Sequence, residues 1–196
     1  TEIYTLSLHD ALPIYFGKRR DTYLKAMNMM TERGAIVLVE TGVARHGLAY
    51  SKSDGASTIV FGIYAKNNGA KLYSVDINPD NIATCQKTID KMNLSSYVEL
   101  NTADSIKYLN AFTQKVDFLY LDSYDYNRNK PEIIKDSQAH HLEEIKAVEK
   151  KLHENSIILI DDCKLPGGGK GKSAIKYLKS KGWKIVINKY QVLLKK

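Results

Sequence analysis

Short apolar runs rich in β-branched residues alternate with stretches of helical periodicity along this chain of 196 residues. The apolar runs occur at 35–40, 71–76, 97–100, 116–121 and 156–160. Helical patterns separate them, at 57–66, 79–92, 104–112 and about 138–153. Strands that alternate with helices pair in parallel, and the helices cover both faces of the sheet. The pattern therefore predicts an α/β fold with a doubly wound, mostly parallel sheet, whose strand-to-helix loops share one ligand-binding edge.

The end of the chain departs from this alternation. Two strand-like runs, 183–187 and 191–194, are separated only by Asn188-Lys189-Tyr190. So short a link forces an antiparallel hairpin, which brings the sheet to about seven strands. Five parallel strands closed by a hairpin resemble the outline of class I methyltransferases, whereas ordinary dinucleotide dehydrogenases continue with further parallel units. The hairpin therefore favours the methyltransferase outline.

The first 34 residues divide into two parts. Thr1–Ile14 resembles translated sequencing-adaptor sequence of the kind found in assembled metagenomes, and we expect it to be a non-native extension rather than a signal peptide. Residues 15–34 contain apolar positions at helical spacing and predict an N-terminal helix that ends at Gly34. The domain proper then spans 35–196.

Composition bounds the compartment and the partners. The longest apolar runs are far shorter than the roughly 20 residues that cross a bilayer. Cys85 and Cys163 lie far apart with no metal-like spacing, so we expect reduced thiols in a soluble, cytoplasmic protein. Residues 164–196 hold ten lysines and no acidic residue, although the net charge of the whole chain is only +7. Such a segment suits a nucleic-acid footprint, but we favour the solvated face of a helix.

The first strand runs into Glu40-Thr41-Gly42, and Gly-Ala-Ser-Thr follows at 55–58. An acidic residue followed two positions later by glycine resembles motif I of class I methyltransferases. The long loop is similar to that of a subgroup whose motif reads ETG…GDG.ST. This resemblance, from about residue 34 to the C-terminus, implies a Rossmann-like domain that binds S-adenosylmethionine. Glu40, Thr41, Gly42 and Ser57 would then lie at the cofactor.

Further carboxylates follow the second and third strands. Asp76 stands where an acidic side chain accepts hydrogen bonds from both ribose hydroxyls, a role that would serve NAD equally well. The resemblance implies that Ile77 lies against the adenine ring, and that Asp104 and Ser105 lie at the adenine edge. Asp104 also suits a helix N-cap, and the two roles are compatible.

Strands four and five also end in carboxylates, at Asp122 and at the pair Asp161-Asp162. Three acidic side chains at one edge form the oxygen-rich set that Mg²⁺ or another hard divalent cation prefers. The pattern resembles metal-dependent O-methyltransferases, but Ser123-Tyr124-Asp125 stands where the catechol-type enzymes carry a lysine base. Two interpretations therefore stay open. Either these three residues bind a metal, or Asp122 contacts the cofactor's amino group or accepts the proton of the substrate.

His140 and His141 begin the helix after the strand-four loop, so we expect at least one to point into the same pocket. A histidine there suits deprotonation of a hydroxyl at neutral pH. The pair is equally compatible with a purely structural helix start. The candidate catalytic residues are thus Asp122, His140 and His141.

The glycine-rich segment 166–173 ends in Gly171-Lys172-Ser173, like a Walker A motif. The first glycine that such a motif requires is replaced by Pro166, and the segment follows the fifth strand instead of opening the domain. We therefore interpret it as a mobile, basic substrate loop whose amides and lysines suit an anionic substrate.

These features together predict an S-adenosylmethionine-dependent methyltransferase. The expected reaction is methyl transfer to oxygen of a small or anionic acceptor, such as a sugar or a polysaccharide-related molecule. Two alternatives remain: a non-catalytic or RNA-associated module with the same fold, and an NAD-dependent oxidoreductase, which the missing G-x-G-x-x-G motif disfavours.

Overall fold

Seven strands pair in the order β3-β2-β1-β4-β5-β7-β6 within residues 16–196, the part of the chain that the computed structural model describes. The strands β1 to β5 run parallel, and β7 is antiparallel to both β5 and β6. The predicted fold class and terminal hairpin are therefore confirmed. The strand bounds are Val37–Thr41 (β1), Lys71–Asp76 (β2), Val98–Thr102 (β3), Val116–Leu121 (β4), Leu152–Ile160 (β5), Lys184–Asn188 (β6) and Val192–Lys195 (β7). The expected extension Thr1–Ile14 lies outside the described residues.

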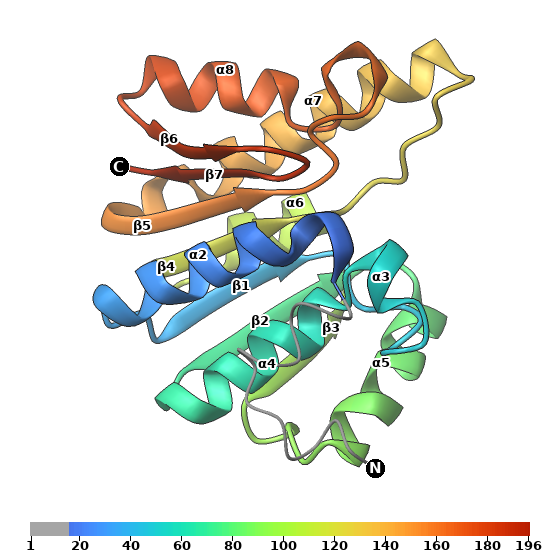
Figure 1. The fold of residues 1–196 in the computed structure, drawn as a ribbon, viewed down its shortest axis with the longest axis vertical. Coiled ribbons are helices and arrows are strands. Elements are labelled where there is room, and N and C mark those ends of the chain that lie inside the picture. Colours follow the sequence, from blue (N-terminus) through green and yellow to red (C-terminus); the bar gives the residue numbers. More distant parts are fainter. Residues whose placement is uncertain (1–15) are drawn as a thin grey trace.

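Helices cover both faces of this sheet (Figure 1). On one face α2, α4 and α5 pack against alternate strand residues such as Leu38, Leu72 and Phe118. On the other face α6, α7 and α8 pack against their neighbours, such as Val39 and Leu119. The helix bounds are Arg20–Glu32 (α2), Ser51–Asp54 (α3), Ser57–Asn68 (α4), Pro79–Lys91 (α5), Ser105–Ala111 (α6), Pro131–Val148 (α7) and Lys172–Ser180 (α8). Because both faces are covered, most residues of the central strands are apolar, as is usual for parallel strands, and the polar Glu40, Thr41 and Ser74 are buried among them.

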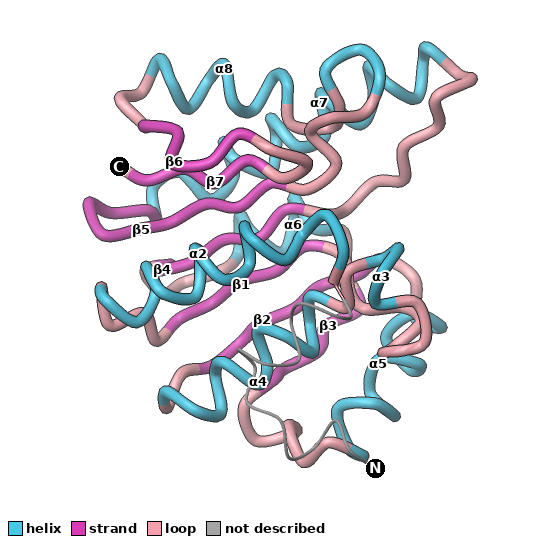
Figure 2. Tube along the Cα trace, in the orientation of Figure 1, coloured by secondary structure: helices cyan, strands magenta, loops and turns pink. Residues whose placement is uncertain are grey.

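Short 3-10 segments complete the description, at Gly17–Arg19 (η2), Glu149–Lys151 (η3) and Pro166–Gly168 (η4). Figure 2 shows that loops join the strands to the helices at both ends of the sheet. The longest of them joins β1 to α4 and contains α3. Its Ala44 amide donates to Thr58 Oγ1 over 2.8 Å, which ties the loop to the start of α4.

Three element predictions need correction or completion. The helix expected from about residue 138 begins at Pro131, because proline suits the first turn, where its missing N–H costs nothing. Strand β5 begins at Leu152, earlier than expected. A helix was favoured for the lysine-rich tail but given no bounds; it is the short helix α8, whose Ala174 and Leu178 are buried and whose lysines at 172, 176 and 179 are exposed. This arrangement is the solvated lysine face that we favoured for part of the basic tail.

Within residues 16–196, every helix is too short or too polar to cross a lipid bilayer.

Candidate active site

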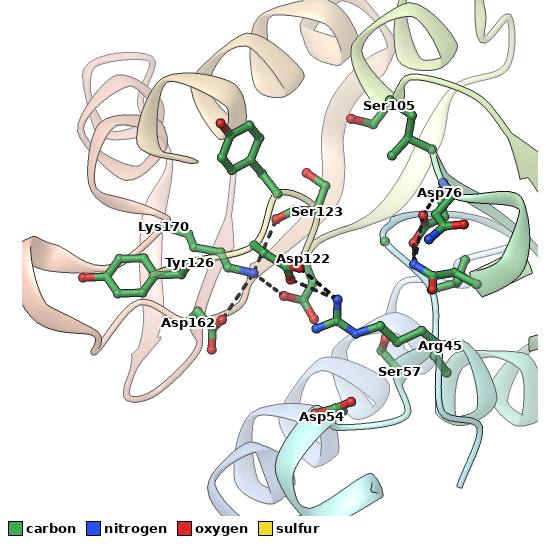
Figure 3. Close-up of a pocket in the computed structure, with 18 of the residues that line it drawn as sticks. Arg45, Asp54, Ser57, Asp76, Ser105, Asp122, Ser123, Tyr126, Asp162 and Lys170 are labelled. Carbon is green, nitrogen blue, oxygen red and sulfur yellow. Dashed lines mark hydrogen bonds and ion pairs between the residues drawn. The ribbon is translucent and has the colours of Figure 1, made fainter. Parts of the chain in front are cut away.

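A cavity of about 780 Å³ lies at the edge of the sheet where the parallel strands end. Its wall includes residues from the loops after β1 to β5 and from the turn of the terminal hairpin. Figure 3 shows two groups of side chains on opposite sides of it. We call the side with Asp76 and Ser105 the β2 end, and the side with Asp122, Asp162 and Lys170 the β5 end.

Gly42 brings the loop after β1 close to the end of β4. Its φ angle is +83°, and a Cβ atom at this position would lie 2.7 Å from the carbonyl oxygen of Asp122. Its amide donates to Val75 O over 2.8 Å. Only glycine tolerates both this backbone conformation and this close approach. The predicted motif I glycine therefore lines the cavity and joins its two ends.

Glu40 and Thr41 lie behind the cavity wall, fully buried in β1. The Glu40 carboxyl accepts hydrogen bonds from Ser57 Oγ and, over 2.6 Å, from Ser74 Oγ. Burial raises the pKa of Glu40 to about 7, although both serine hydrogen bonds oppose the shift. Ser57 itself lines the cavity. Glu40 thus holds Ser57 in place. Glu40 and Thr41 themselves are not part of the cavity wall, so their predicted contact with the cofactor stays a prediction.

The β2 end presents a carboxylate beside an apolar side chain. Asp76 accepts hydrogen bonds from the Asn78 amide at 2.8 Å and from Asn81 Nδ2 at 3.3 Å, and it lines the cavity. Ile77 also lines it and is 71% exposed. Asp104 caps α6 by accepting from the Lys107 amide at 2.9 Å, and it lines the cavity too. These groups suit a ligand that has two rings. A ring with hydroxyl groups could donate hydrogen bonds to Asp76, and a flat aromatic ring could pack against Ile77.

A buried polar network lies between the two ends. Ser105 Oγ is 3.0 Å from His140 Nε2, and both residues line the cavity. Glu144, fully buried, lies 3.4 Å from the same nitrogen and accepts a hydrogen bond from Ser123 Oγ over 2.6 Å. Burial lowers the pKa of His140, but the hydrogen bond and charge of Glu144 outweigh it, and the net shift is upward. His140 is therefore the histidine that reaches the cavity.

His141 does not line the cavity. Its ring is fully buried, with Nδ1 2.9 Å from the carbonyl oxygen of Ser137 in the preceding turn. Burial lowers the pKa of His141 despite the nearby charge of Glu144. His141 therefore lies behind the cavity wall, and the catalytic role predicted for it stays a prediction that the cavity lining does not favour.

Asp122 and Asp162 share one cation at the β5 end. Lys170 Nζ is 3.0 Å from Asp122 Oδ1 and 3.2 Å from Asp162 Oδ2 (Figure 3). Burial raises the pKa of Asp122 well above its usual range; Lys170 opposes this shift, and the neighbouring carboxylates add to it. The pKa of Asp162 is lowered despite burial, because Lys170 and the Tyr190 hydroxyl favour its charged form. The two carboxylates therefore differ in proton affinity.

Asp161 has a different set of side-chain partners. Its side chain is fully buried and accepts from Arg19 Nε and from Tyr120 Oη, each over 2.6 Å. It does not line the cavity. The three carboxylates predicted to bind a divalent cation are thus already matched with two cationic side chains. Among residues 16–196 no group of three His, Cys, Asp or Glu side chains is arranged to hold a metal ion, so the predicted metal site does not form from these residues.

The sequence of the chain matches a known family model over residues 52–163, which is more than half of its length. That model describes a methyltransferase domain. The chain belongs to the methyltransferase domain family. The predicted resemblance is therefore confirmed at this level. No curated protein matches the chain significantly.

Solved structures share the fold of this methyltransferase domain at low sequence identity. An SAH-bound methyltransferase from Podospora anserina has a TM-score of 0.63 at 14% identity, covering 90% of this chain and 78% of its own. A Staphylococcus aureus protein with a provisional caffeoyl-CoA O-methyltransferase assignment has a TM-score of 0.63 at 10% identity, covering 89% and 83%. A methyltransferase from Geobacter sulfurreducens has a TM-score of 0.58 at 16% identity, covering 90% of this chain and 75% of its own.

Sequence reasoning missed several residues of the methyltransferase cavity. The sequence placed Arg19 in the N-terminal helix, Lys170 in a mobile loop and Tyr190 in the hairpin turn, and none of the three was predicted as a site residue. All three line the cavity, and Lys170 is only 3% exposed. One signal was available for Lys170: three carboxylates at one edge need compensating positive charge, and a lysine follows them closely along the chain.

Proposed function

We propose that this methyltransferase domain binds S-adenosylmethionine across the β2 end of the cavity and transfers its methyl group to an acceptor at the β5 end. The observation that carries the proposal is the juxtaposition of Gly42, Asp76, Ile77 and Asp104 around one cavity, in a chain of the methyltransferase family. Carboxyl ends of parallel strands are the usual ligand-binding edge of such sheets. The SAH-bound neighbour with the same fold supports the choice of cofactor.

Each residue of the β2 end has a role that fits its geometry. Asp76 accepts hydrogen bonds from the ribose hydroxyls, since its carboxylate lines the cavity and is held by Asn78 and Asn81. Ile77 covers one face of the adenine, which explains why so large an apolar side chain stands exposed in the wall. Asp104 and Ser105 stand at the adenine edge, and the backbone at Gly42 leaves room for the methionine part.

The reaction is an in-line displacement at the methyl carbon. The carbon–sulfur bond breaks, its electron pair returns to sulfur and neutralises the sulfonium, and a lone pair of the acceptor oxygen forms the new bond. The acceptor proton passes to a base in the cavity wall. Asp122 and His140 are the two candidates, because both line the cavity and the pKa of each is raised. Alignment of the two reactants provides most of the rate enhancement.

The acceptor is a small or anionic molecule with a free hydroxyl, such as a sugar or a polysaccharide-related compound. Tyr124, Tyr126 and Tyr190 line the β5 half of the cavity and offer ring surfaces of the kind that sugar and aromatic rings pack against. Arg128 adds a cationic group to the same wall. These side chains favour a ring-containing acceptor with a negative charge over a long polymer strand.

Calorimetry with SAH and NAD tests the cofactor assignment without a known acceptor. We expect one SAH molecule to bind per chain and NAD to give no measurable heat under the same conditions. NAD binding, or the absence of SAH binding by a folded sample, would contradict the proposal. SAH binding combined with no methyl transfer to any of a panel of hydroxylated sugars and phenols would favour the non-catalytic alternative.

A further inference from the structure

Lys170 is held in an unusual place for a lysine of a glycine-rich loop. The loop between β5 and α8 folds back on the end of its own strand. The approach is so close that a Cβ atom at Gly169 would lie 2.1 Å from the carbonyl oxygen of Asp162. Gly169 has a φ angle of +63°, in the region that favours glycine. The Lys170 amide then donates to the same Asp162 oxygen over 3.2 Å. This backbone arrangement directs the lysine into the protein, where its side chain is 4% exposed.

The ammonium group lies close to three oxygens there. It donates hydrogen bonds to Asp122 Oδ1 at 3.0 Å and to the carbonyl oxygen of Ser123 at 3.4 Å, and it forms an ion pair with Asp162 Oδ2 at 3.2 Å. An ammonium has three donors and no acceptor, so three oxygens match its capacity. Asp122 follows β4 and Asp162 follows the neighbouring β5. One fixed cation therefore joins the ends of two adjacent strands.

Burial does not remove this charge. Desolvation lowers the pKa of Lys170, but Asp122 and Asp162 outweigh it and raise the pKa above its usual value. Two carboxylates that both contact one nitrogen atom are close enough to repel each other when no cation lies between them. A divalent metal bound by two carboxylates and water would satisfy the same need with the same oxygens. The Lys170 side chain thus supplies, between Asp122 and Asp162, the positive charge that a bound metal ion would otherwise supply.

We propose that Lys170 takes the place of a divalent cation at the β5 end and acts as the positioning residue for Asp122 and Asp162. The third carboxylate, Asp161, is paired with Arg19 Nε over 2.6 Å. Arg19 Nη2 also lies 3.6 Å from Asp162 Oδ1, so Lys170 is the nearer of two cations at Asp162, and it is the one that contacts Asp122 as well. The inference adds a role at the acceptor side of the proposed function. It follows that the native protein has no divalent-cation site at this edge, and that shortening Lys170 creates one.

Mn²⁺ binding, followed by the electron paramagnetic resonance of the free ion, tests this directly. Wild type is expected to show no site at this edge with a Kd below about 1 mM, the weak end of the range for protein oxygen sites. The variant Lys170→Ala is expected to bind one Mn²⁺ at least tenfold more tightly than wild type. The double variant Lys170→Ala/Asp162→Asn should lose that gain, because one of the two carboxylates is gone. Lys172→Ala is the matched control, since it removes an exposed lysine from the same segment and should leave Mn²⁺ binding at the wild-type level.

Thermal unfolding extends the test if Lys170→Ala is unstable. Mn²⁺ should raise the Tm of Lys170→Ala and leave the Tm of wild type and Lys172→Ala unchanged, because an ion that binds only the folded state stabilises it. Mn²⁺ binding by wild type that Asp122→Asn weakens tenfold would overturn the proposal. So would a folded Lys170→Ala protein that gains neither Mn²⁺ affinity nor Mn²⁺-dependent Tm. SAH calorimetry on the same samples reports on the proposed cofactor separately, so each idea can fail alone.

Discussion

The two ends of the cavity both present carboxylates, but they hold them differently. At the β2 end, Asp76 and Asp104 accept hydrogen bonds from groups a few residues along the chain, such as the Asn78 and Lys107 amides. At the β5 end, Asp122 is paired with a lysine 48 residues away, and Asp161 with an arginine 142 residues away. Locally held carboxylates leave oxygen lone pairs for a ligand, whereas long-range ion pairs tie elements together. We therefore propose that the β2 end mainly binds the cofactor, and that the β5 end, which the acceptor enters, also braces the fold.

The largest effect is expected from Arg19→Ala. This change leaves the fully buried Asp161 without its cation, and breaking a buried pair in this way costs about 3 to 5 kcal/mol of unfolding free energy. Urea denaturation measures it. The neighbouring control Arg20→Ala removes an exposed contact to Asp21 and should cost less than about 1 kcal/mol. Equal effects of the two substitutions would mean that the β5 end does not brace the fold.

Glu40 makes the comparison sharper, because it is a buried carboxyl under the β2 end whose neighbours are serines. Its pKa is about 7 in the folded protein against an ordinary 4.5. Between these values the unfolded chain releases the proton while the folded protein keeps it, so stability falls as pH rises. The loss amounts to about 3 kcal/mol by pH 7 and above.

Urea denaturation of Glu40→Gln between pH 4.5 and 8 checks this dependence. The amide cannot titrate, so the difference in unfolding free energy between wild type and the variant should change across this pH window in favour of the variant at high pH. If the unfolding free energies of the two proteins changed in parallel with pH, Glu40 would have an ordinary pKa. The buried carboxyl near the β2 end would then not differ from those at the β5 end in the way described.

A smaller effect, on binding alone, is expected from Asp76→Ala. Loss of a charged hydrogen bond to the ribose should weaken SAH binding by about 1.5 to 3 kcal/mol. The unfolding free energy should change little, because among residues 16–196 the Asp76 carboxylate accepts hydrogen bonds only from Asn78 and Asn81, at the cavity rim. Asp80→Ala, in the first turn of α5 and outside the cavity wall, is the control and should leave SAH affinity unchanged. A folded Asp76→Ala protein with wild-type affinity would reject the ribose assignment.

The same contrast explains what the sequence could and could not predict. Gly42, Asp76 and Ile77 could be predicted as cavity residues because each belongs to a short motif at the end of a strand. The position of each one depends on its immediate neighbours in the sequence. The doubly wound parallel sheet and the terminal hairpin followed from strand and helix periods and from a link too short for a crossover, whereas the order of the strands was not predicted. Helix α7 was predicted to begin too late, because a polar first turn with few apolar positions carries no periodic signal.

Contacts at the β5 end have no such local signature. Arg19 reaches Asp161 only after α2 packs on the sheet, and Lys170 turns inward only because the Gly169 backbone folds against Asp162. The sequence shows three carboxylates together, and a metal is a reasonable inference from that pattern alone. Whether a metal or a side chain supplies the positive charge depends on tertiary packing, which residue spacing does not reveal.

A crystal structure of the SAH complex grown with Mn²⁺, using the anomalous scattering of manganese, tests the contrast between the two ends most directly. We predict SAH at the β2 end, with its ribose hydroxyls on Asp76, its adenine against Ile77 and its sulfur directed toward the β5 end. Lys170 Nζ should remain between Asp122 and Asp162, with no manganese peak there. SAH bound away from Asp76, or a manganese peak that displaces Lys170 from the two carboxylates, would contradict the account.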